Sequence, residues 1–299
     1  MNYTLNQLNV FLKVSQTLNI TKAAEELHLT QPAVSIQLKN FQQQFDIPLI
    51  EVVQKKLYLT DFGKEIAEAA ERIIEEAKAI ENKMHEHQGA LTGKLKVASV
   101  STGIYIAPYF LGDFIKSNDN VELTLDVTNK NQVIESLEQN KVDFAFVSVL
   151  PENLNTQHIE LLSNKLYLIG NQDSPENNQD LDKLPLIFRE KGSGTRHVME
   201  KYLLTRNMSL KPKLELTGNE AIKHAVIAGL GYSIMPLIGI KQELDKGLLK
   251  IIHRQEFPIE SKWMLIWMKN KKLSPVANAF LTYLENTKSD MINAHFHWA

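Results

Sequence analysis

The apolar positions of residues 20–45 recur at helical intervals in two short runs, which are separated by a turn at His28-Leu29-Thr30. Thr30 is expected to cap the second helix, and Pro32 falls in its first turn, where a missing N–H does no harm. Two helices this short must pack on each other, which predicts a helix-turn-helix. The apolar positions of the two runs are Ile20, Ala23, Ala24 and Leu27, followed by Val34, Leu38, Phe41 and Phe45.

The opposite face of the second helix bears on what this hairpin does. A hairpin that reads DNA and one that only packs within a helical domain share the same periodicity. The exposed positions Gln31, Ser35, Ile36 and Lys39 form a short, polar and mostly uncharged face. Glutamine can pair with adenine and serine with a base edge or a phosphate, whereas a merely solvated face more often carries Glu and Lys pairs. This face favours the DNA-reading interpretation.

Three further elements surround the hairpin. A helix is predicted before it, from Leu5, Leu8, Phe11 and Leu12. After it, the segment IPLIEVVQKKLYLTDFG predicts a two-stranded wing with Lys55 and Lys56 at its tip, where a phosphate contact and a solvated turn fit equally well. From Thr60 to about Gln88 runs a single helical pattern about 42 Å long. Its narrow apolar stripe favours a dimerisation arm over an isolated connector.

The rest of the chain alternates strands and helices, which predicts parallel sheets with helices on both faces. We expect a DNA-binding domain over residues 1–60, a linker helix over 61–89 that ends in a glycine hinge at Gly89 and Gly93, and an α/β domain over 90–299. The α/β domain divides into two subdomains around a cleft, the first at about 94–164 and 268–299 and the second at about 165–267. Residues 160–170 form either a strand pair or one strand that crosses between the subdomains.

Polar residues follow several predicted strands, at the edge where open α/β sheets bind ligands. The sharpest of these segments is residues 190–196, in which two glycines permit a close approach of the backbone and hydroxyls stand at a helix start that favours anions. A carboxylate, sulfate or phosphate site is favoured over an ordinary glycine turn, and Thr195 and Arg196 are predicted to hold the anion. Asn219 opens another helix and is expected mainly to cap it. The predicted site comprises Ser99, Ser101, Thr102, Thr128, Asn129, Ser148, Arg189, Ser193, Gly194, Thr195 and Arg196.

Composition narrows these interpretations. The 299 residues have a net charge of −2, and residues 1–60 carry only +1, which is little for phosphate binding. The absence of cysteine excludes disulfides, thiolate metal sites and a cysteine nucleophile. The nine histidines lack the spacing of metal ligands, so no metal site is expected. No Walker loop, dinucleotide fingerprint or nucleophile elbow occurs, so we expect neither a bound cofactor nor enzymatic activity. Without a signal peptide or a long apolar run, we expect a cytoplasmic protein outside the membrane.

Four stretches together resemble the LysR-type transcriptional regulators over essentially the whole chain. They are TKAAEELHLTQPAVSIQLKNF, DIPLIEVVQKKLYLTDFG, the long helix and the α/β remainder. FREKGSGTRHVME and GNEAIKHAVIAGLGYSIMP resemble particularly the branch that regulates carbon-fixation and sulfur-assimilation genes. The implied fold class is α/β with an all-α N-terminal part. It comprises a winged helix-turn-helix, a dimerising linker helix and a two-subdomain effector domain like a periplasmic solute-binding protein.

The resemblance also implies partners. These are double-stranded promoter DNA, a small anionic metabolite in the cleft that changes DNA binding and bending, further copies of the chain in a homodimer or homotetramer, and RNA polymerase. The implied DNA contacts are Thr21, Thr30, Gln31, Pro32, Ser35, Gln37, Lys39, Lys55 and Lys56. The chain departs from the family pattern at Val52-Val53 and at Phe41-Gln42, so wing contacts rest more on the two lysines. The alternative function is a solute-binding or transferase-like α/β protein with a helical dimerisation arm.

Overall fold

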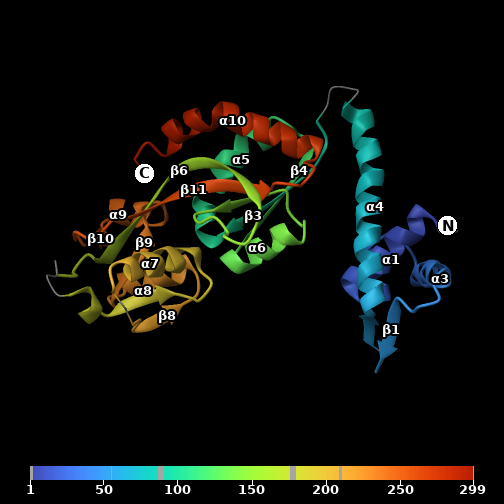
Figure 1. Cartoon of the computed structure of the whole chain (residues 1–299), viewed down its shortest axis with the longest axis horizontal. Helices are drawn as coiled ribbons and strands as arrows, with labels where there is room; N and C mark the ends of the chain where they lie inside the picture. Colours follow the sequence, from blue (N-terminus) through green and yellow to red (C-terminus); the bar gives the residue numbers. More distant parts are fainter. Residues whose placement is uncertain (1–2, 55, 87–90, 176–179, 209–210, 299) are drawn as a thin grey trace. The chain divides into compact units, whose positions relative to one another are not determined.

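A computed structural model describes residues 3–54, 56–86, 91–175, 180–208 and 211–298 (Figure 1). The chain forms two compact units, Met1–Ala90 and Leu91–Ala299. Within the described residues, no helix is both long enough and apolar enough to cross a membrane.

The first unit contains the predicted helix-turn-helix, which is confirmed. Thr30 caps its second helix, since Thr30 Oγ1 accepts a hydrogen bond from the backbone N–H of Ala33 at 3.4 Å. His28, in the turn, has a positive φ of 54°, which redirects the chain between the helices. Val34 packs with Ala23 and Ala24 in one small core, and Phe41 packs in a second one. The helices are α1 (Leu5–Thr17), α2 (Ile20–Glu26), α3 (Gln31–Gln42) and α4 (Asp61–Glu86).

The predicted wing is also present, as the antiparallel pair β1 (Ile50–Val53) and β2 (Lys56–Leu59), with Ile50 opposite Leu59. Its outer end is apolar, because Val52 and Val53 are 69% and 51% exposed. Lys55 lies outside the described residues. The long helix α4 starts directly after the wing, where Thr60 Oγ1 accepts a bond from the Gly63 N–H at 2.9 Å. The expected hinge at Gly89 again lies outside the described residues.

The second unit is built on one mixed sheet with the strand order β4-β3-β5-β11-β6-β9-β7-β8, and β10 pairs with β6. Its elements are β3 (Gly93–Val100), η1 (Ser101–Tyr105), α5 (Ala107–Lys116), β4 (Val121–Thr128), α6 (Lys130–Glu138), β5 (Phe144–Val147), β6 (Thr156–Asn171), η2 (Leu181–Lys183), β7 (Leu186–Arg189), α7 (Gly194–Thr205), β8 (Leu214–Leu216), α8 (Asn219–Ile227), β9 (Tyr232–Pro236), η3 (Leu237–Gly239), α9 (Lys241–Asp245), β10 (Leu249–Ile251), β11 (Ile259–Met268) and α10 (Pro275–His295).

Two long strands join the subdomains. Residues 160–170 belong to the single strand β6, so of the two alternatives they form one strand and not a strand pair. Strand β6 pairs antiparallel with β11, from Thr156 opposite Met268 to Leu166 opposite Ile259. The strands β3, β4 and β5 are parallel, as are β7, β8 and β9. The sheet is therefore mixed and not purely parallel, because no crossover helix separates β5 from β6.

The buried apolar side chains of the second unit form separate cores along the two long strands. One core, which includes Trp263 and Phe280, lies among β3, β5, β11, α5 and α10. Trp263 therefore packs with the first subdomain, although the expected boundary near residue 268 assigned it to the second. The second subdomain has a core on each face of its sheet, since the neighbouring residues Leu168 and Ile169 of β6 belong to different clusters. A strand that is buried on both faces requires apolar residues at successive positions. These cores hold the strands β3, β4 and β7, whose carboxyl ends carry the predicted site residues, in place.

Candidate functional site

The predicted DNA-contact residues lie mostly on the exposed surface of the first unit. Gln31, Pro32 and Lys39 of α3 are exposed, whereas Ser35 and Gln37 are half-buried. Gln31 Nε2 donates a hydrogen bond to Ser35 Oγ at 3.0 Å, so these two side chains present one polar surface. The remaining members lie on other segments, with Thr21 exposed on α2, Thr30 exposed at the α3 cap and Lys56 exposed on β2.

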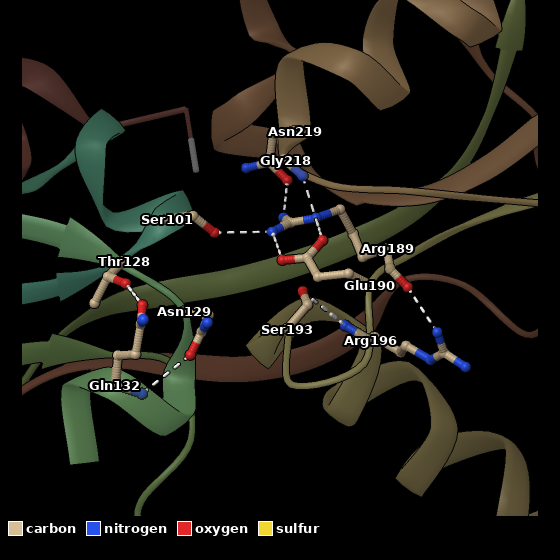
Figure 2. Close-up of polar contacts among 10 residues, drawn as sticks. All are labelled: Ser101, Thr128, Asn129, Gln132, Arg189, Glu190, Ser193, Arg196, Gly218 and Asn219. Atoms are coloured by element: carbon tan, nitrogen blue, oxygen red, sulfur yellow. Dashed lines mark hydrogen bonds and ion pairs between the residues drawn. The ribbon is translucent and has the colours of Figure 1, made fainter. Parts of the chain in front are cut away.

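In the second unit, Arg189 forms the centre of a polar cluster (Figure 2). It ends strand β7, and its side chain is only 2% exposed. Its Nε and Nη2 donate to the two carboxylate oxygens of Glu190 at 2.8 and 2.7 Å. Nη2 also donates to Ser101 Oγ at 3.0 Å, and Nη1 donates to Asn219 Oδ1. We call Ser101, Arg189, Glu190, Gly218 and Asn219 the Arg189 cluster.

The start of helix α8 completes this cluster. Gly218 has a φ of +87°, and its backbone N–H donates to Glu190 Oε2 at 3.3 Å. The expectation that Asn219 caps α8 is wrong, because Gly218 occupies the cap position without a side-chain bond. Asn219 instead supports Arg189. Its amide Nδ2 has no hydrogen-bond partner among the described residues, although the residue is only 6% exposed.

Opposing effects set the charge of Glu190. Burial by itself would raise the pKa of its carboxyl group, but the hydrogen bonds and the charge of Arg189 outweigh burial and hold that pKa below its usual value. Glu190 is therefore ionised at neutral pH. The guanidinium and the carboxylate form a charge-assisted pair of the bidentate kind.

Several other predicted residues face this cluster from neighbouring elements. Figure 2 shows Thr128 and Asn129 on the side opposite Arg189 and Ser193. Asn129 and Ser193 cap α6 and α7 through their side-chain oxygens. A Cβ added to Gly194 would lie 3.6 Å from Ser148 Oγ, so the start of α7 adjoins the end of β5. The fold thus assembles strand ends from both subdomains. Thr102, Ser148 and Thr195 in this region are buried.

Two predicted residues are engaged elsewhere. Ser99 is fully buried and donates to the Val100 carbonyl at 3.1 Å, beneath η1. The Arg196 guanidinium is paired with Glu200 and Glu215, each at 2.7 Å. Burial would lower the pKa of Arg196, and the hydrogen bonds and charges of these two carboxylates more than compensate and raise it. Figure 2 shows that its Nη1 donates to the backbone carbonyl of Arg189, at 2.8 Å, and not to the side chains of the Arg189 cluster. Of the two arginines, Arg189 has the more suitable position for a ligand between the subdomains.

A second contact joins the subdomains beside the cluster. Tyr105 of η1 donates from its hydroxyl to Glu220 Oε1 of α8 at 2.8 Å. Burial, together with this hydrogen bond, raises the pKa of Tyr105 to about 12, so the phenol remains protonated. Lys223 forms ion pairs with Glu220 and Glu243, both at 2.9 Å. The subdomains are therefore linked through Tyr105 as well as through Ser101 and Arg189.

Other features of the described surface suit an anion less well. A hollow of about 340 Å³ beside Thr128 is lined by Asp126, Glu135 and Lys141, and its two carboxylates would repel a negative ligand. Within the described ranges, no group of three or more His, Asp or Glu side chains stands in a metal-binding arrangement. The Arg189 cluster remains the better ligand site.

Glu190 and Asn219 were not among the predicted site residues. Glu190 belongs to the glycine-rich segment 190–196, but a carboxylate repels an anion and was therefore not expected to take part in an anion site. Asn219 carried the weaker signal of a polar residue at a helix start. The proximity of Asn219 to Arg189 depends on how β7 and α8 pack together, and so does the bond from the Gly218 N–H to Glu190.

Comparisons with known proteins agree across both units. The family described as "Bacterial regulatory helix-turn-helix protein, lysR family" matches residues 5–64, and "LysR substrate binding domain" matches residues 88–288. The HTH-type transcriptional activator CmpR of a Synechocystis strain is 36% identical over 95% of each chain. The RuBisCO operon transcriptional regulator of Allochromatium vinosum is 34% identical over 95% of this chain and 96% of its own.

A solved structure extends this likeness to the second unit. The regulatory domain of CcmR from Synechocystis PCC6803, in complex with 2-PG, superposes with a TM-score of 0.61 at 30% identity. The match covers 69% of this chain and 99% of that domain. The chain belongs to the LysR family of DNA-binding transcriptional regulators, with a helix-turn-helix unit and an effector-binding domain.

Proposed function

We propose that a small anionic metabolite with a phosphate group binds at the Arg189 cluster and regulates promoter binding by this protein. The observation that carries the proposal is the buried guanidinium of Arg189, which Ser101 and Asn219 hold between the two subdomains. A buried arginine with a planar fork of donors suits a phosphate or carboxylate. The 2-PG (2-phosphoglycolate) complex of CcmR supports a ligand of this class. The CmpR and RuBisCO-operon relatives support carbon-fixation genes as targets.

Titration calorimetry on the full chain tests the ligand class. We expect 2-phosphoglycolate to bind at least about tenfold more tightly than glycolate, because the phosphate adds charge and acceptor oxygens. Inorganic phosphate is the second comparison and lacks the carboxylate. Equal affinity for all three compounds, or no binding at all, would contradict the proposal.

For the DNA side, we propose that α3 reads bases and that the wing binds phosphate. Gln31→Ala is expected to cost about 1–3 kcal/mol on the preferred site and to relax base selection at one position. Lys56→Ala is expected to weaken binding to all sequences and to reduce the salt slope by about one. Asn40→Ala, an exposed change on the same helix, is the control. Fluorescence anisotropy on specific and random duplexes at several salt concentrations separates these outcomes, and the same uniform loss for both variants would refute the division of roles.

We further propose that α4 mediates dimerisation. Ile73 and Ile80 are 42% and 71% exposed and stand seven residues apart on this helix. Burying an isoleucine contributes about 1.5–3 kcal/mol. Ile73→Glu is therefore expected to weaken self-association at least about tenfold in analytical ultracentrifugation. Lys64→Glu introduces the same side chain at an exposed position of α4 and should leave the association unchanged. Unaltered association of the Ile73 variant would place the dimer contact elsewhere.

The remaining partners stay predictions. A two-fold dimer requires half-sites about one helical turn of DNA apart, or a multiple of this distance. Assembly into tetramers and contact with RNA polymerase are implied by the resemblance, and the cytoplasmic location is the expectation from the sequence. The DNA-binding family match over residues 5–64 decides against a solute-binding or transferase-like protein.

A further inference from the structure

Glu190 lies where an anionic ligand of Arg189 would bind. A guanidinium offers its best edge for a carboxylate or phosphate through two parallel N–H groups. In this protein, the Nε and Nη2 edge of Arg189 is taken by the two oxygens of Glu190. Glu190 Oε2 also accepts the Gly218 N–H at the start of α8, a further donor that suits an anion. The side chain of Glu190 thus uses the donors that the site would offer to a ligand.

We propose that Glu190 is an internal competitor of the effector, which must displace the Glu190 carboxylate from Arg189 in order to bind. This inference rests on the proposed function, because it assumes that the effector's anionic group binds Arg189. Its consequence is that Glu190 sets the effector concentration to which the regulator responds. It also disfavours weakly charged ligands that cannot replace a carboxylate.

The unequal burial of the pair indicates which group moves. The Arg189 side chain is 2% exposed, and Asn219 and Ser101 hold it from two other elements. The Glu190 side chain is 19% exposed, and it accepts hydrogen bonds from Arg189 and from the Gly218 N–H. Glu190 therefore has a route to solvent, whereas Arg189 does not. Two anions on one guanidinium repel each other, so binding of the ligand and departure of Glu190 are coupled.

Asn219 fixes the orientation of Arg189 without competing for the edge that Glu190 occupies. Asn219 Nδ2 has no acceptor within the part of the chain that the structure describes, while its Oδ1 accepts from Arg189. In Figure 2, this amide nitrogen points away from Arg189. The Asn219 side chain therefore holds Arg189 through Nη1 and leaves the Nε and Nη2 edge to Glu190 or to a ligand. A phosphate carries up to two charges and three acceptor oxygens, so it can displace a single carboxylate from that edge.

Calorimetry with 2-phosphoglycolate and glycolate on full-length variants tests the competition. We expect Glu190→Gln to bind 2-phosphoglycolate about tenfold more tightly than the wild type, because a neutral amide competes less for Arg189. Glycolate should gain more than 2-phosphoglycolate does, so that the preference for the phosphorylated ligand narrows. Glu215→Gln is the matched control: it makes the same chemical change at the partner of Arg196 and should leave both affinities as they are. Saturating 2-phosphoglycolate should also raise the melting temperature of Glu190→Gln by more than that of the wild type.

The outcomes separate this inference from the proposed function. If the wild type binds neither compound, both proposals fall. If the wild type binds 2-phosphoglycolate and a folded Glu190→Gln binds it equally or more weakly, the competition is refuted and the effector class stands. If circular dichroism shows that Glu190→Gln does not fold, a crystal structure of the wild-type complex decides. We expect Glu190 displaced from Nε and Nη2 of Arg189, and an intact Glu190–Arg189 pair in that complex would overturn the inference.

Discussion

Replacement of Arg189 by methionine is expected to lower the affinity for 2-phosphoglycolate by at least about 100-fold. Hydrogen bonds to charged groups contribute about 1.5–3 kcal/mol each, and the loss of two such bonds exceeds the roughly 2.7 kcal/mol that 100-fold requires. Methionine approximates the length of the arginine stem and fills its buried channel without the donors. Calorimetry on the full chain measures the loss. DNA binding without effector should persist, because α3 and the wing belong to the other compact unit.

The same change at Arg196 provides the control. Arg196 follows Arg189 by seven residues and flanks the same glycine loop, but its guanidinium is paired with Glu200 and Glu215. Those carboxylates are 47% and 43% exposed, so these pairs stabilise the fold only modestly. Arg196→Met should change effector affinity by no more than about threefold. Equal losses for the two variants would mean that the shape of the loop, and not the charge of Arg189, determines binding.

Replacement of Gly63 by alanine is expected to destabilise the DNA-binding unit by on the order of 3 kcal/mol and to abolish tight DNA binding. An added Cβ at Gly63 would collide with the carbonyl oxygen of Leu49. This carbonyl cannot easily withdraw, because it accepts a hydrogen bond from the Thr60 N–H at 3.1 Å, and the Leu49 N–H donates to Gln42 at 2.8 Å. Relief of the collision must therefore shift the wing relative to α3 and α4.

Thermal and urea unfolding of the full chain, with anisotropy on promoter DNA, measure this effect. Gly112→Ala is the matched control, since Gly112 lies within α5 and an added Cβ there meets nothing within 4 Å. That variant should be neutral or more stable by about 0.5–1 kcal/mol, because alanine favours a helix over glycine. Wild-type stability and DNA affinity in Gly63→Ala would show that the junction of wing and helix adapts freely.

Elements that depend on neighbours in the chain were predicted well. The helix-turn-helix, the wing and the long helix were found from periodicity and turn residues, and Thr30 caps α3 as expected. The pairing of the two long strands could not be predicted from local periodicity. Strand β6 pairs with β11, where Leu166 lies opposite Ile259, and the pattern of apolar residues in one strand does not specify which other strand it pairs with. The sequence therefore left open whether residues 160–170 form a strand pair or one strand.

The ligand site shows the same division at the level of single side chains. Local sequence placed Arg189 and Arg196 beside one glycine loop and favoured Arg196, with Thr195, as the residue that holds the anion. Their difference arises from residues far along the chain. Arg189 bonds to Ser101, 88 positions earlier, and to Asn219, 30 positions later, whereas Arg196 finds Glu200 and Glu215. Residue types and spacing specify which groups are available and on which strand ends they stand. Only the packing of distant elements specifies that Arg189 is buried between η1 and α8 and that Arg196 pairs with two partly exposed carboxylates, because electrostatic partnership depends on distance in space.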